Sequence, residues 1–393
     1  MLWGALEVKN VYIIGSKGIP ANYGGFETFV ENLTGLKKSS ALQYYVACLS
    51  DEAGTFAYHD ATCFNVPVPN VGPGKAIVYD LKALKWVINH VKENNVQSAV
   101  VYILACRIGP FLAPYLRKLH QLGVACYLNP DGHEWLRAKW SKPVRHYWKL
   151  SEKMMVRQVD LVICDSVNIE KYIHQNYESD HLRTCFVPYG ATVASEKGAI
   201  TADQQAWFDH RQVALNEYYL IVGRFVPENN YKTMITEFMR SQTRRKLVIV
   251  TNVEHNKFYD DLEQETHFSQ DSRIQFVGTV YNQALLKVIR ENAFAYLHGH
   301  EVGGTNPSLL EALASTSLNL LLDVGFNHEV GKAAARYWTK DQGSLAQLIN
   351  EVDTWDEQQR QDYGVLAKHR ITQAYNWDDI VSTYEAIFLG EKS

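Results

Sequence analysis

Short apolar runs alternate with segments of helical periodicity along this 393-residue chain. A short apolar run bounded by turn residues is typical of a buried strand, and apolar residues that recur every three or four positions indicate a helix. In the first half the apolar runs predict strands at Val11–Gly15, Tyr44–Leu49, Cys63–Val68, Ala99–Leu104, Ala125–Asn129, Leu161–Cys164 and Thr184–Val187. The periodic segments predict helices at Phe26–Leu36, Tyr79–Lys92, Pro110–Leu122 and Pro143–Arg157.

After a less regular polar stretch the alternation restarts. It predicts strands at Tyr218–Val222, Lys246–Thr251, Arg273–Val277, Ala293–Leu297 and Asn319–Val324, and helices at Tyr231–Ser241, Gln283–Glu291, Ser308–Ala314 and Trp377–Leu389. Alternating strands and helices favour parallel sheets covered on both faces. We therefore expect an α/β protein of two Rossmann-like domains facing a cleft, at residues 1–195 and 196–375. A last helix in residues 376–393 is expected to cross back to the first domain.

Composition and charge narrow the class of protein. The net charge of −4 gives no general reason to expect nucleic acid as a partner. The six cysteines are scattered singly and are expected to be reduced and buried. The first residues lack the pattern of a signal peptide, and no apolar run is long enough for a membrane span. We expect a cytoplasmic protein.

The most informative motif is the segment His298–Leu313, in which glycines and small polar residues lie between a predicted strand and a predicted helix. Unpaired backbone N–H groups and the positive end of the helix dipole meet at such a point, so an anion can bind there. Glu311, one turn into the helix, can reach a sugar hydroxyl beside that anion. A phosphate cradle with a carboxylate for a ribose suggests a nucleotide-linked ligand. The alternative is an ordinary turn capped by Thr305 or Ser308.

Two other loops at strand ends carry candidate phosphate ligands. The first, Gly15–Glu27, is rich in glycine but is neither a P-loop nor Gly-x-Gly-x-x-Gly. Gly24 and Gly25 precede a predicted helix and can hold a phosphate, the alternative being a long structural turn. In the second loop, Arg224 is suited to bidentate pairing with a diphosphate, and Lys232 is a weaker candidate that can simply be solvated.

The loop Asn129–Trp135 contains the densest group of titratable residues. Asp131, His133 and Glu134 can each hydrogen-bond or deprotonate an acceptor hydroxyl. The alternative is turn chemistry from Asp131 and Gly132, with the other two merely exposed.

Basic and aromatic residues interleave in the helix that follows this loop. Arg145, Lys149, Lys153 and Arg157 recur every four residues, and Trp140 lies just before the helix. This pattern suits docking at an anionic membrane surface. A packed helix with a solvated basic face explains it equally well.

Motifs for metal or nucleophilic chemistry are weak. The sequence has no Asp-x-Asp and no Gly-x-Ser-x-Gly. His298-x-His300 is a lone pair beside glycine and is better explained by a phosphate-side or structural position than by a metal. We therefore expect no metal and no cofactor.

With these loops assembled, the chain resembles the retaining family 4 glycosyltransferases of the GT-B fold, and more closely the rhamnosyltransferases of bacterial capsule and cell-wall polysaccharide synthesis. The resemblance rests on four motifs that span nearly the whole chain, at 12–29, 131–140, 222–230 and 303–313. It implies that the second domain binds the nucleotide sugar. Glu311 matches the family glutamate that holds the ribose, Arg224 matches the diphosphate-binding arginine, and backbone around Val280 would meet the base.

The combined prediction for the site has four parts. We expect Asp131, Arg224 and Glu311 to be the catalytic residues. The expected donor site consists of Gly24, Gly25, Arg224, Lys232, Val280, Gly303, Gly304, Thr305, Asn306 and Glu311. The expected acceptor site consists of Asp131, His133, Glu134 and Arg137. The expected membrane-facing residues are Trp140, Arg145, Lys149 and Lys153.

Two positions depart from the family pattern. A second glutamate is usual eight positions before the ribose-binding one, where this chain has Gly303, and Glu301 lies ten before. A lysine is usual five positions after the arginine, where this chain has Asn229. Neutralisation of the diphosphate is therefore expected to rest on Arg224 with Lys232 or Lys17.

The resemblance implies transfer of L-rhamnose, with retention, from dTDP-β-L-rhamnose to a sugar carried on a lipid diphosphate. The expected enzyme is a hexosyltransferase, as a β-1,4-rhamnosyltransferase, and its acceptor is GlcNAc or glucose on undecaprenyl diphosphate at the inner face of the plasma membrane. Three alternatives stay open: a UDP-sugar-dependent glycosyltransferase of the same fold, a nucleotide-sugar 2-epimerase, and a silent sugar-nucleotide binding subunit. The sequence predicts no oligomeric state.

Overall fold

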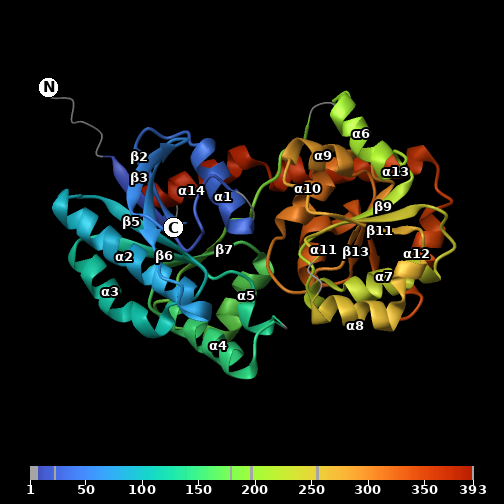
Figure 1. Cartoon of the computed structure of the whole chain (residues 1–393). Coiled ribbons are helices and arrows are strands. Elements are labelled where there is room, and N and C mark those ends of the chain that lie inside the picture. The colour runs from blue at the N-terminus through green and yellow to red at the C-terminus, as the bar shows by residue number, and fades with distance from the viewer. Residues whose placement is uncertain are drawn as a thin grey trace. The chain divides into compact units, whose positions relative to one another are not determined.

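The computed structural model describes residues 8–21, 24–137, 139–177, 179–194, 198–253 and 256–391. The chain divides into two compact units, each built on its own sheet (Figure 1). Unit 1 comprises residues 1–136, 140–189 and 377–393, and unit 2 comprises residues 137–139 and 190–376. The predicted domain boundary at 195/196 lies outside the described residues, and the chain passes from unit 1 to unit 2 after Tyr189.

Unit 1 contains an eight-stranded sheet in the order β3-β4-β2-β1-β5-β6-β7-β8. All neighbouring strands are parallel except β3, which runs antiparallel to β4 at one edge. The strands are β1 (Lys9–Ile14), β2 (Leu42–Ser50), β3 (Gly54–Tyr58), β4 (Ala61–Pro67), β5 (Ala99–Leu104), β6 (Val124–Asn129), β7 (Leu161–Cys164) and β8 (Thr184–Phe186). The α-helices are α1 (Gly25–Gly35), α2 (Lys75–Glu93), α3 (Gly109–Gln121), α4 (Lys142–Val156), α5 (Val167–Tyr177) and α14 (Trp377–Leu389).

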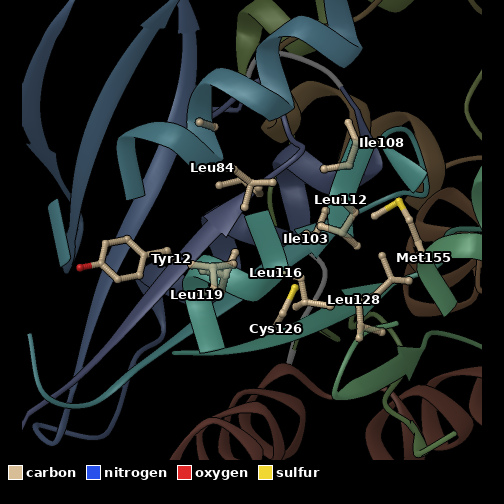
Figure 2. Close-up of a cluster of buried hydrophobic side chains, with 14 of the residues drawn as sticks. Tyr12, Leu84, Ile103, Ile108, Leu112, Leu116, Leu119, Cys126, Leu128 and Met155 are labelled. Carbon is tan, nitrogen blue, oxygen red and sulfur yellow. The ribbon is translucent and has the colours of Figure 1, made fainter. Parts of the chain in front are cut away.

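The core of unit 1 forms where helices cover the central strands. Every residue of β5 is buried, as expected for a parallel strand covered on both faces. Figure 2 shows apolar side chains from several elements meeting on one side of this sheet. The cluster includes Tyr12, Leu84, Ile103, Ile108, Leu112, Leu116, Leu119, Cys126, Leu128 and Met155. The helical spacing of apolar residues in the sequence of α2 and α3 therefore does mark the faces that build the core.

The last helix, α14, is an integral part of unit 1, although it follows the whole of unit 2 in the sequence. Its buried Glu385 accepts hydrogen bonds from the backbone N–H groups of Lys38 and Ser39, at 2.7 and 3.0 Å. Tyr384 lies 3.2 Å from the hydroxyl of Tyr102 on β5 and contacts the ring of Phe29. The expectation that this helix returns to the first domain is confirmed.

Unit 2 contains a six-stranded parallel sheet in the order β11-β10-β9-β12-β13-β14. The strands are β9 (Tyr218–Val222), β10 (Lys246–Val250), β11 (Ile274–Gly278), β12 (Ala295–His298), β13 (Asn319–Leu322) and β14 (Arg336–Trp338). The α-helices are α6 (Ala202–His210), α7 (Tyr231–Arg240), α8 (Lys257–Thr266), α9 (Gln283–Glu291), α10 (Pro307–Ser315), α11 (Gly325–Gly331), α12 (Ser344–Val352) and α13 (Glu357–Ala374).

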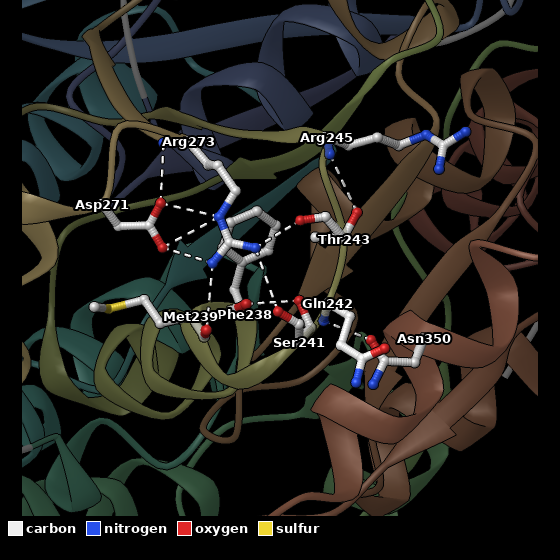
Figure 3. Close-up of polar contacts among 9 residues, drawn as sticks. All are labelled: Phe238, Met239, Ser241, Gln242, Thr243, Arg245, Asp271, Arg273 and Asn350. Carbon is white, nitrogen blue, oxygen red and sulfur yellow. Dashed lines mark hydrogen bonds and ion pairs between the residues drawn. The ribbon is translucent and has the colours of Figure 1, made fainter.

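A half-buried arginine, Arg273, fixes one end of this second sheet. Arg273 pairs with Asp271 at 2.6 Å and also donates to the carbonyl oxygens of Met239, Ser241 and Thr243 (Figure 3). These three carbonyls lie at and beyond the end of α7, where backbone acceptors have no partner within the helix. The network holds the connection between α7 and β10 at the amino end of the sheet, on the opposite edge from the candidate site.

Because every strand but β3 runs parallel to its neighbours, the carboxyl ends of these strands lie along one edge of each sheet. Among the described residues, no helix is long and apolar enough to cross a membrane. In a parallel sheet of this kind, ligands bind beyond the carboxyl ends of the strands. The loops after β1, β5, β6, β9 and β12 are therefore where a site is expected.

Candidate functional site

In unit 2 the loop between β12 and α10 lies beside the end of β9. Asn306 caps α10, because its side-chain oxygen accepts a hydrogen bond from the N–H of Leu309 at 3.2 Å. The hydroxyl of Ser308 donates to the carbonyl of Val222, the last residue of β9, at 3.1 Å. The cap is thus Asn306, rather than Thr305 or Ser308 as the structural alternative proposed. The start of α10 and the loop that contains Arg224 meet at one edge of the sheet.

The turn before α10 has room beside its backbone. Gly303 has a φ of 139°, which a residue with a side chain rarely adopts, and a Cβ atom there would meet nothing within 4 Å. Gly304 follows in the same bend, and Thr305 is buried at its end. Glu301 forms an ion pair with Lys340. The predicted cradle residues therefore form one continuous turn, and the acid at position 301 is already paired.

Glu311 has an ion-pair partner that the sequence did not reveal. Its Oε2 lies 2.6 Å from Nη2 of Arg290, which comes from the last turn of α9 and is only 4% exposed. The Glu311 side chain as a whole is about a third exposed. The side chain predicted to hold a ribose is thus anchored by a buried arginine and partly open to solvent.

Arg224 and Lys232 differ in their surroundings. Arg224 is exposed, and its backbone carbonyl accepts a hydrogen bond from the side chain of Asn229 at 2.7 Å. Asn229 therefore shapes the loop rather than adding a charge. Lys232 pairs with Glu265 of α8 and remains 58% exposed. Of the two predicted cations, Arg224 has the side chain without a carboxylate partner among the described residues.

Val280 lies in the loop after β11, between this strand and α9. It is half-buried and packs against the apolar cluster beneath α9. Its predicted contact with a base through the backbone stays a prediction.

Several buried polar atoms at this edge of unit 2 have no hydrogen-bond partner among the described residues. They include both carboxylate oxygens of Glu228, Nε2 of His298 and Nδ1 of His300. The two imidazole rings are stacked at 4.4 Å, with an interplanar angle of 13°. Burial lowers the pKa of His298 well below its usual value, and burial together with the Arg224 charge lowers the pKa of His300 to about 3. Both rings are neutral at pH 7, and unpaired polar atoms of this kind call for a partner.

In unit 1 the turn before α1 is partly filled by a carboxylate of its own helix. Gly24 has a φ of 130°, and a Cβ atom on it would lie 2.0 Å from Oε2 of Glu27. The other oxygen of Glu27 accepts a hydrogen bond from the backbone N–H of Lys17 at 2.7 Å. A diphosphate at Gly24 and Gly25 would meet this negative charge, so the predicted contact requires the Glu27 carboxylate to move.

The loop after β6 brings together three of the four predicted acceptor residues. Asp131 has a left-handed backbone, and its side chain accepts from the N–H of Gly132 at 2.8 Å, so the turn chemistry foreseen for this pair is present. Glu134 accepts a hydrogen bond from the indole N–H of Trp140 at 2.9 Å. Burial, with a smaller contribution from the Lys149 charge, lowers the pKa of His133 to about 4. Arg137 is buried and groups with unit 2.

Two of these acids, Asp131 and Glu134, line one small hollow in unit 1 together with a third acid, Glu152. The hollow is lined by Ala105, Cys106, Pro130, Asp131, Glu134, Trp135, Trp148 and Glu152. Glu152 of α4 is buried and accepts hydrogen bonds from the hydroxyls of Tyr172 and Tyr177. Burial raises the pKa of its carboxyl group. Sequence reasoning missed Glu152, because it lies in an ordinary helical pattern and its tyrosine partners come from α5, which was not predicted.

The four residues predicted to face a membrane have different environments. Lys153 is exposed, whereas Lys149 contacts the Tyr172 hydroxyl and lies 4.3 Å from the centre of the Trp135 ring. Arg145 donates to the carbonyl of Leu136 at 2.6 Å. Trp140 is half-buried beside Trp148. Lys149 therefore belongs to the interior network around Glu152, and only part of the predicted basic row remains on the surface.

The described residues contain no group of three or more His, Cys, Asp or Glu side chains arranged to hold a metal ion. The expected independence of a metal stays a prediction.

Comparison with known proteins identifies the fold. Residues 8–192 match the family described as "Domain of unknown function (DUF1972)". No curated protein matches the chain. Among solved structures it is similar to a sucrose-phosphate synthase from Thermosynechococcus elongatus, with 15% identity, a TM-score of 0.74 and 98% of each chain covered.

Two further similar structures span the same length. An alpha,alpha-trehalose 6-phosphate synthase from Burkholderia multivorans has 12% identity and a TM-score of 0.69, with 98% of this chain and 97% of that chain covered. HepE from Anabaena, in complex with UDP and glucose, has 14% identity and a TM-score of 0.70, with 98% of this chain and all of that chain covered. The chain has the two-sheet GT-B fold, as its sequence predicted.

Proposed function

We propose that this protein is a glycosyltransferase in which unit 2 holds a nucleotide sugar and unit 1 holds the acceptor. The observation that supports this most directly is the edge of unit 2 where Arg224, the start of α10 and Glu311 meet. An exposed guanidinium, the positive end of the α10 dipole and a carboxylate one turn away match the diphosphate and the ribose of one ligand. HepE, which has a similar fold, was solved with UDP and glucose.

The proposed reaction is a displacement at the anomeric carbon of the donor sugar. The bond from that carbon to the diphosphate oxygen breaks, and a bond to the acceptor oxygen forms on the same face. The departing phosphate oxygen takes the proton of the acceptor hydroxyl. Arg224 and the positive end of the α10 dipole stabilise the negative charge that develops on the diphosphate, so the proposal needs no metal.

On the acceptor side, Asp131 and Glu134 lie in the same loop of unit 1, after β6. In this proposal Asp131 positions the acceptor hydroxyl, and Glu134 and His133 contribute contacts around it. Because its pKa is low, His133 is neutral at pH 7 and can offer a hydrogen bond without a charge.

We propose dTDP-β-L-rhamnose as the donor and GlcNAc or glucose on undecaprenyl diphosphate as the acceptor, joined in a β-1,4 linkage. The motifs that resemble bacterial rhamnosyltransferases support this choice. For a lipid-linked acceptor, the exposed side of α4 offers Lys142, Lys153 and Arg157 beside exposed Leu150. Cations with an apolar residue among them suit the anionic inner face of a plasma membrane.

A UDP-sugar is the second candidate donor, because HepE is a UDP complex of similar fold. Both candidates place the nucleoside diphosphate at the same edge of unit 2. They differ in the base and in the sugar that is transferred.

The test is a reaction panel. Purified protein is incubated with dTDP-rhamnose, UDP-glucose or UDP-GlcNAc, each with and without a lipid-diphosphate-GlcNAc acceptor, and products are separated by mass. We expect a rhamnosylated lipid only when dTDP-rhamnose and the acceptor are both present. Product from a UDP-sugar would replace the donor assignment, and an epimerised nucleotide sugar formed without acceptor would overturn glycosyl transfer.

A further inference from the structure

The carboxylate of Glu311 has two oxygens in unlike situations. Oε2 is bound by Nη2 of Arg290 at 2.6 Å. Among the described residues, no donor reaches Oε1, and about a third of the Glu311 side chain is exposed. One oxygen is therefore committed inside the protein, and one is left for a ligand.

Arg290 cannot easily release the carboxylate. It is 4% exposed, and its Nε has no hydrogen-bond partner in the described part of the chain. Glu311 is the carboxylate with which it pairs. A buried guanidinium that lost this partner would keep an uncompensated charge, which costs far more than the loss of a surface ion pair.

The backbone around this pair is held as well. The hydroxyl of Thr316, just after α10, donates to the carbonyl of Arg290 at 2.9 Å. The two helices that carry Arg290 and Glu311 are thereby joined at their ends. The carboxylate is fixed in position and in rotation before any ligand arrives.

A ribose presents two neighbouring hydroxyl groups, and a free carboxylate can accept a hydrogen bond from each with a separate oxygen. A 2′-deoxyribose has only one of these hydroxyls. With Oε2 held against the buried Arg290, we expect Oε1 to be the oxygen that meets the sugar and to accept from one hydroxyl of either ribose or 2′-deoxyribose, so that the second hydroxyl adds little.

We propose that Arg290 is a positioning residue that makes the Glu311 contact a one-oxygen contact, so that the site accepts 2′-deoxyribose nucleotides as readily as ribose nucleotides. This inference rests on the proposed function, because it assumes that Glu311 meets the nucleotide's sugar. It gives a physical reason why a thymidine diphosphate donor, which carries 2′-deoxyribose, is not at a disadvantage in this fold.

The test compares UDP with dUDP, which share a base and a diphosphate and differ only in the 2′-hydroxyl. Binding of each to the wild-type protein is measured by calorimetric titration. We expect the two Kd values to agree within about threefold, since one hydrogen bond to a charged group changes affinity by roughly tenfold or more. A wild-type preference for UDP of tenfold or more would overturn the inference without the use of any variant.

Two variants extend the comparison. Arg290→Met releases Oε2, and we expect weaker binding of dUDP together with a preference for UDP of about tenfold, from the hydrogen bond that the free oxygen can then accept. Arg290→Lys retains the charge and should keep the ratio near that of the wild type. Arg336→Met is the control, because its ion pair with Glu351 lies on the surface of the same unit. Unchanged Kd values and an unchanged ratio in Arg290→Met would contradict the proposal.

The outcomes separate this inference from the proposed function. If the wild-type protein binds neither nucleotide, the proposed function is wrong and the inference falls with it. If both nucleotides bind but the ratio contradicts the expectation, only the role of Arg290 is wrong.

Discussion

Two glycine-containing turns connect a strand to a helix in this protein, and they differ in the charge at the start of the helix that follows. In unit 1 the turn before α1 is followed by Glu27, whose carboxylate accepts the N–H of Lys17 and lies against Gly24. In unit 2 the first turn of α10 contains no acid, and its cap is the neutral side chain of Asn306. Both turns have the glycines that suit a phosphate. The first turn already has the negative charge of Glu27 beside it. The second turn has no acid to offset the positive end of its helix dipole.

The comparison teaches that glycine content alone does not identify an anion site. Glycine allows the close approach of a ligand to the backbone, but the charge in the first helical turn decides which ligand is attracted. A carboxylate at a helix N-terminus stabilises the helix and competes with an incoming phosphate. On this basis we propose that unit 2 holds the principal diphosphate site and that the contribution of Gly24 and Gly25 is secondary.

The largest effect is expected from Arg224→Ala. It removes the exposed guanidinium beside α10, and we expect turnover with a nucleotide sugar to fall by roughly 10²- to 10³-fold, the usual cost of losing one donor to a developing oxyanion. Steady-state rates with the donor and acceptor of the reaction panel measure this. Arg244→Ala is the matched control, because Arg244 is an exposed arginine of the same unit at the amino end of β10. Equal losses in both variants would refute a specific role for Arg224.

Asn306→Asp introduces a negative charge at the start of α10, as Glu27 does at the start of α1. Asp and Asn are equally good caps, so the unfolding midpoint should stay within a degree or two. The new negative charge should weaken nucleoside diphosphate binding by on the order of tenfold or more, because it faces a second negative charge within a few ångströms. Titration with dTDP measures the change, and undiminished affinity would show that the diphosphate lies elsewhere.

The reverse substitution, Glu27→Gln, tests the first turn. Glutamine keeps a hydrogen-bond acceptor for Lys17 and removes the charge. We expect dTDP affinity to be unchanged or higher in the same titration. A clear loss of affinity would show that the Glu27 carboxylate takes part in binding rather than competing with it.

The stacked histidines of unit 2 give a pH dependence to its stability. Burial lowers the pKa of His298, and burial with the Arg224 charge lowers the pKa of His300 to about 3, against an unfolded value near 6.5. The unfolded chain therefore binds protons more readily, so this contribution is complete above pH 6.5 and declines as the pH falls toward the folded pKa. From pH 7 to pH 5 we expect a loss of about 1–2 kcal/mol per histidine.

Denaturant unfolding at the two pH values measures this loss. The variant His300→Gln, which cannot take up a proton, should show a smaller decrease between pH 7 and pH 5 than the wild type. An equal decrease would mean that His300 does not titrate between the folded and unfolded states.

The smallest effect concerns the surface of α4. Lys153→Glu should weaken binding to vesicles that contain anionic lipid by several-fold, since each basic residue near such a surface contributes about 1 kcal/mol. Sedimentation with anionic and with neutral vesicles measures it. Lys118→Glu, on α3 of the same unit, makes the same change of charge on a different helix. A loss that is equal for both variants would indicate general electrostatics rather than a surface centred on α4.

The alternation of apolar runs was enough to predict the fold, because a buried parallel strand is apolar on both faces. β5, β7 and β9 begin and end where the sequence placed them. The edge strand β3 was missed, since its residues are mostly exposed and carry no apolar run. Helix α13 was missed for a related reason: it buries only Gly364, Ala367 and Ile371, so its apolar periodicity is faint.

Site residues that lie just after a strand could be predicted from the sequence. A residue that reaches the site from another helix could not. Asp131 and Arg224 lie in loops at strand ends, and Glu311 lies one turn into the helix that follows such a loop, all of which the alternation located. Arg290 lies in a helix whose sequence gives no sign that its side chain is buried. Its partnership with Glu311, 21 positions later, depends on the packing of α9 against α10, which no local pattern specifies.

The most direct test of the central claim is a calorimetric titration of dTDP into the wild-type protein and into Glu311→Gln, with the unfolding midpoint of each protein measured alongside. The account predicts one binding site in the wild type. It also predicts that affinity falls by about tenfold in a Glu311→Gln variant that remains folded, because a charged acceptor for the sugar hydroxyl is lost. Absence of binding to the wild type, or equal affinity in the two folded proteins, would contradict it.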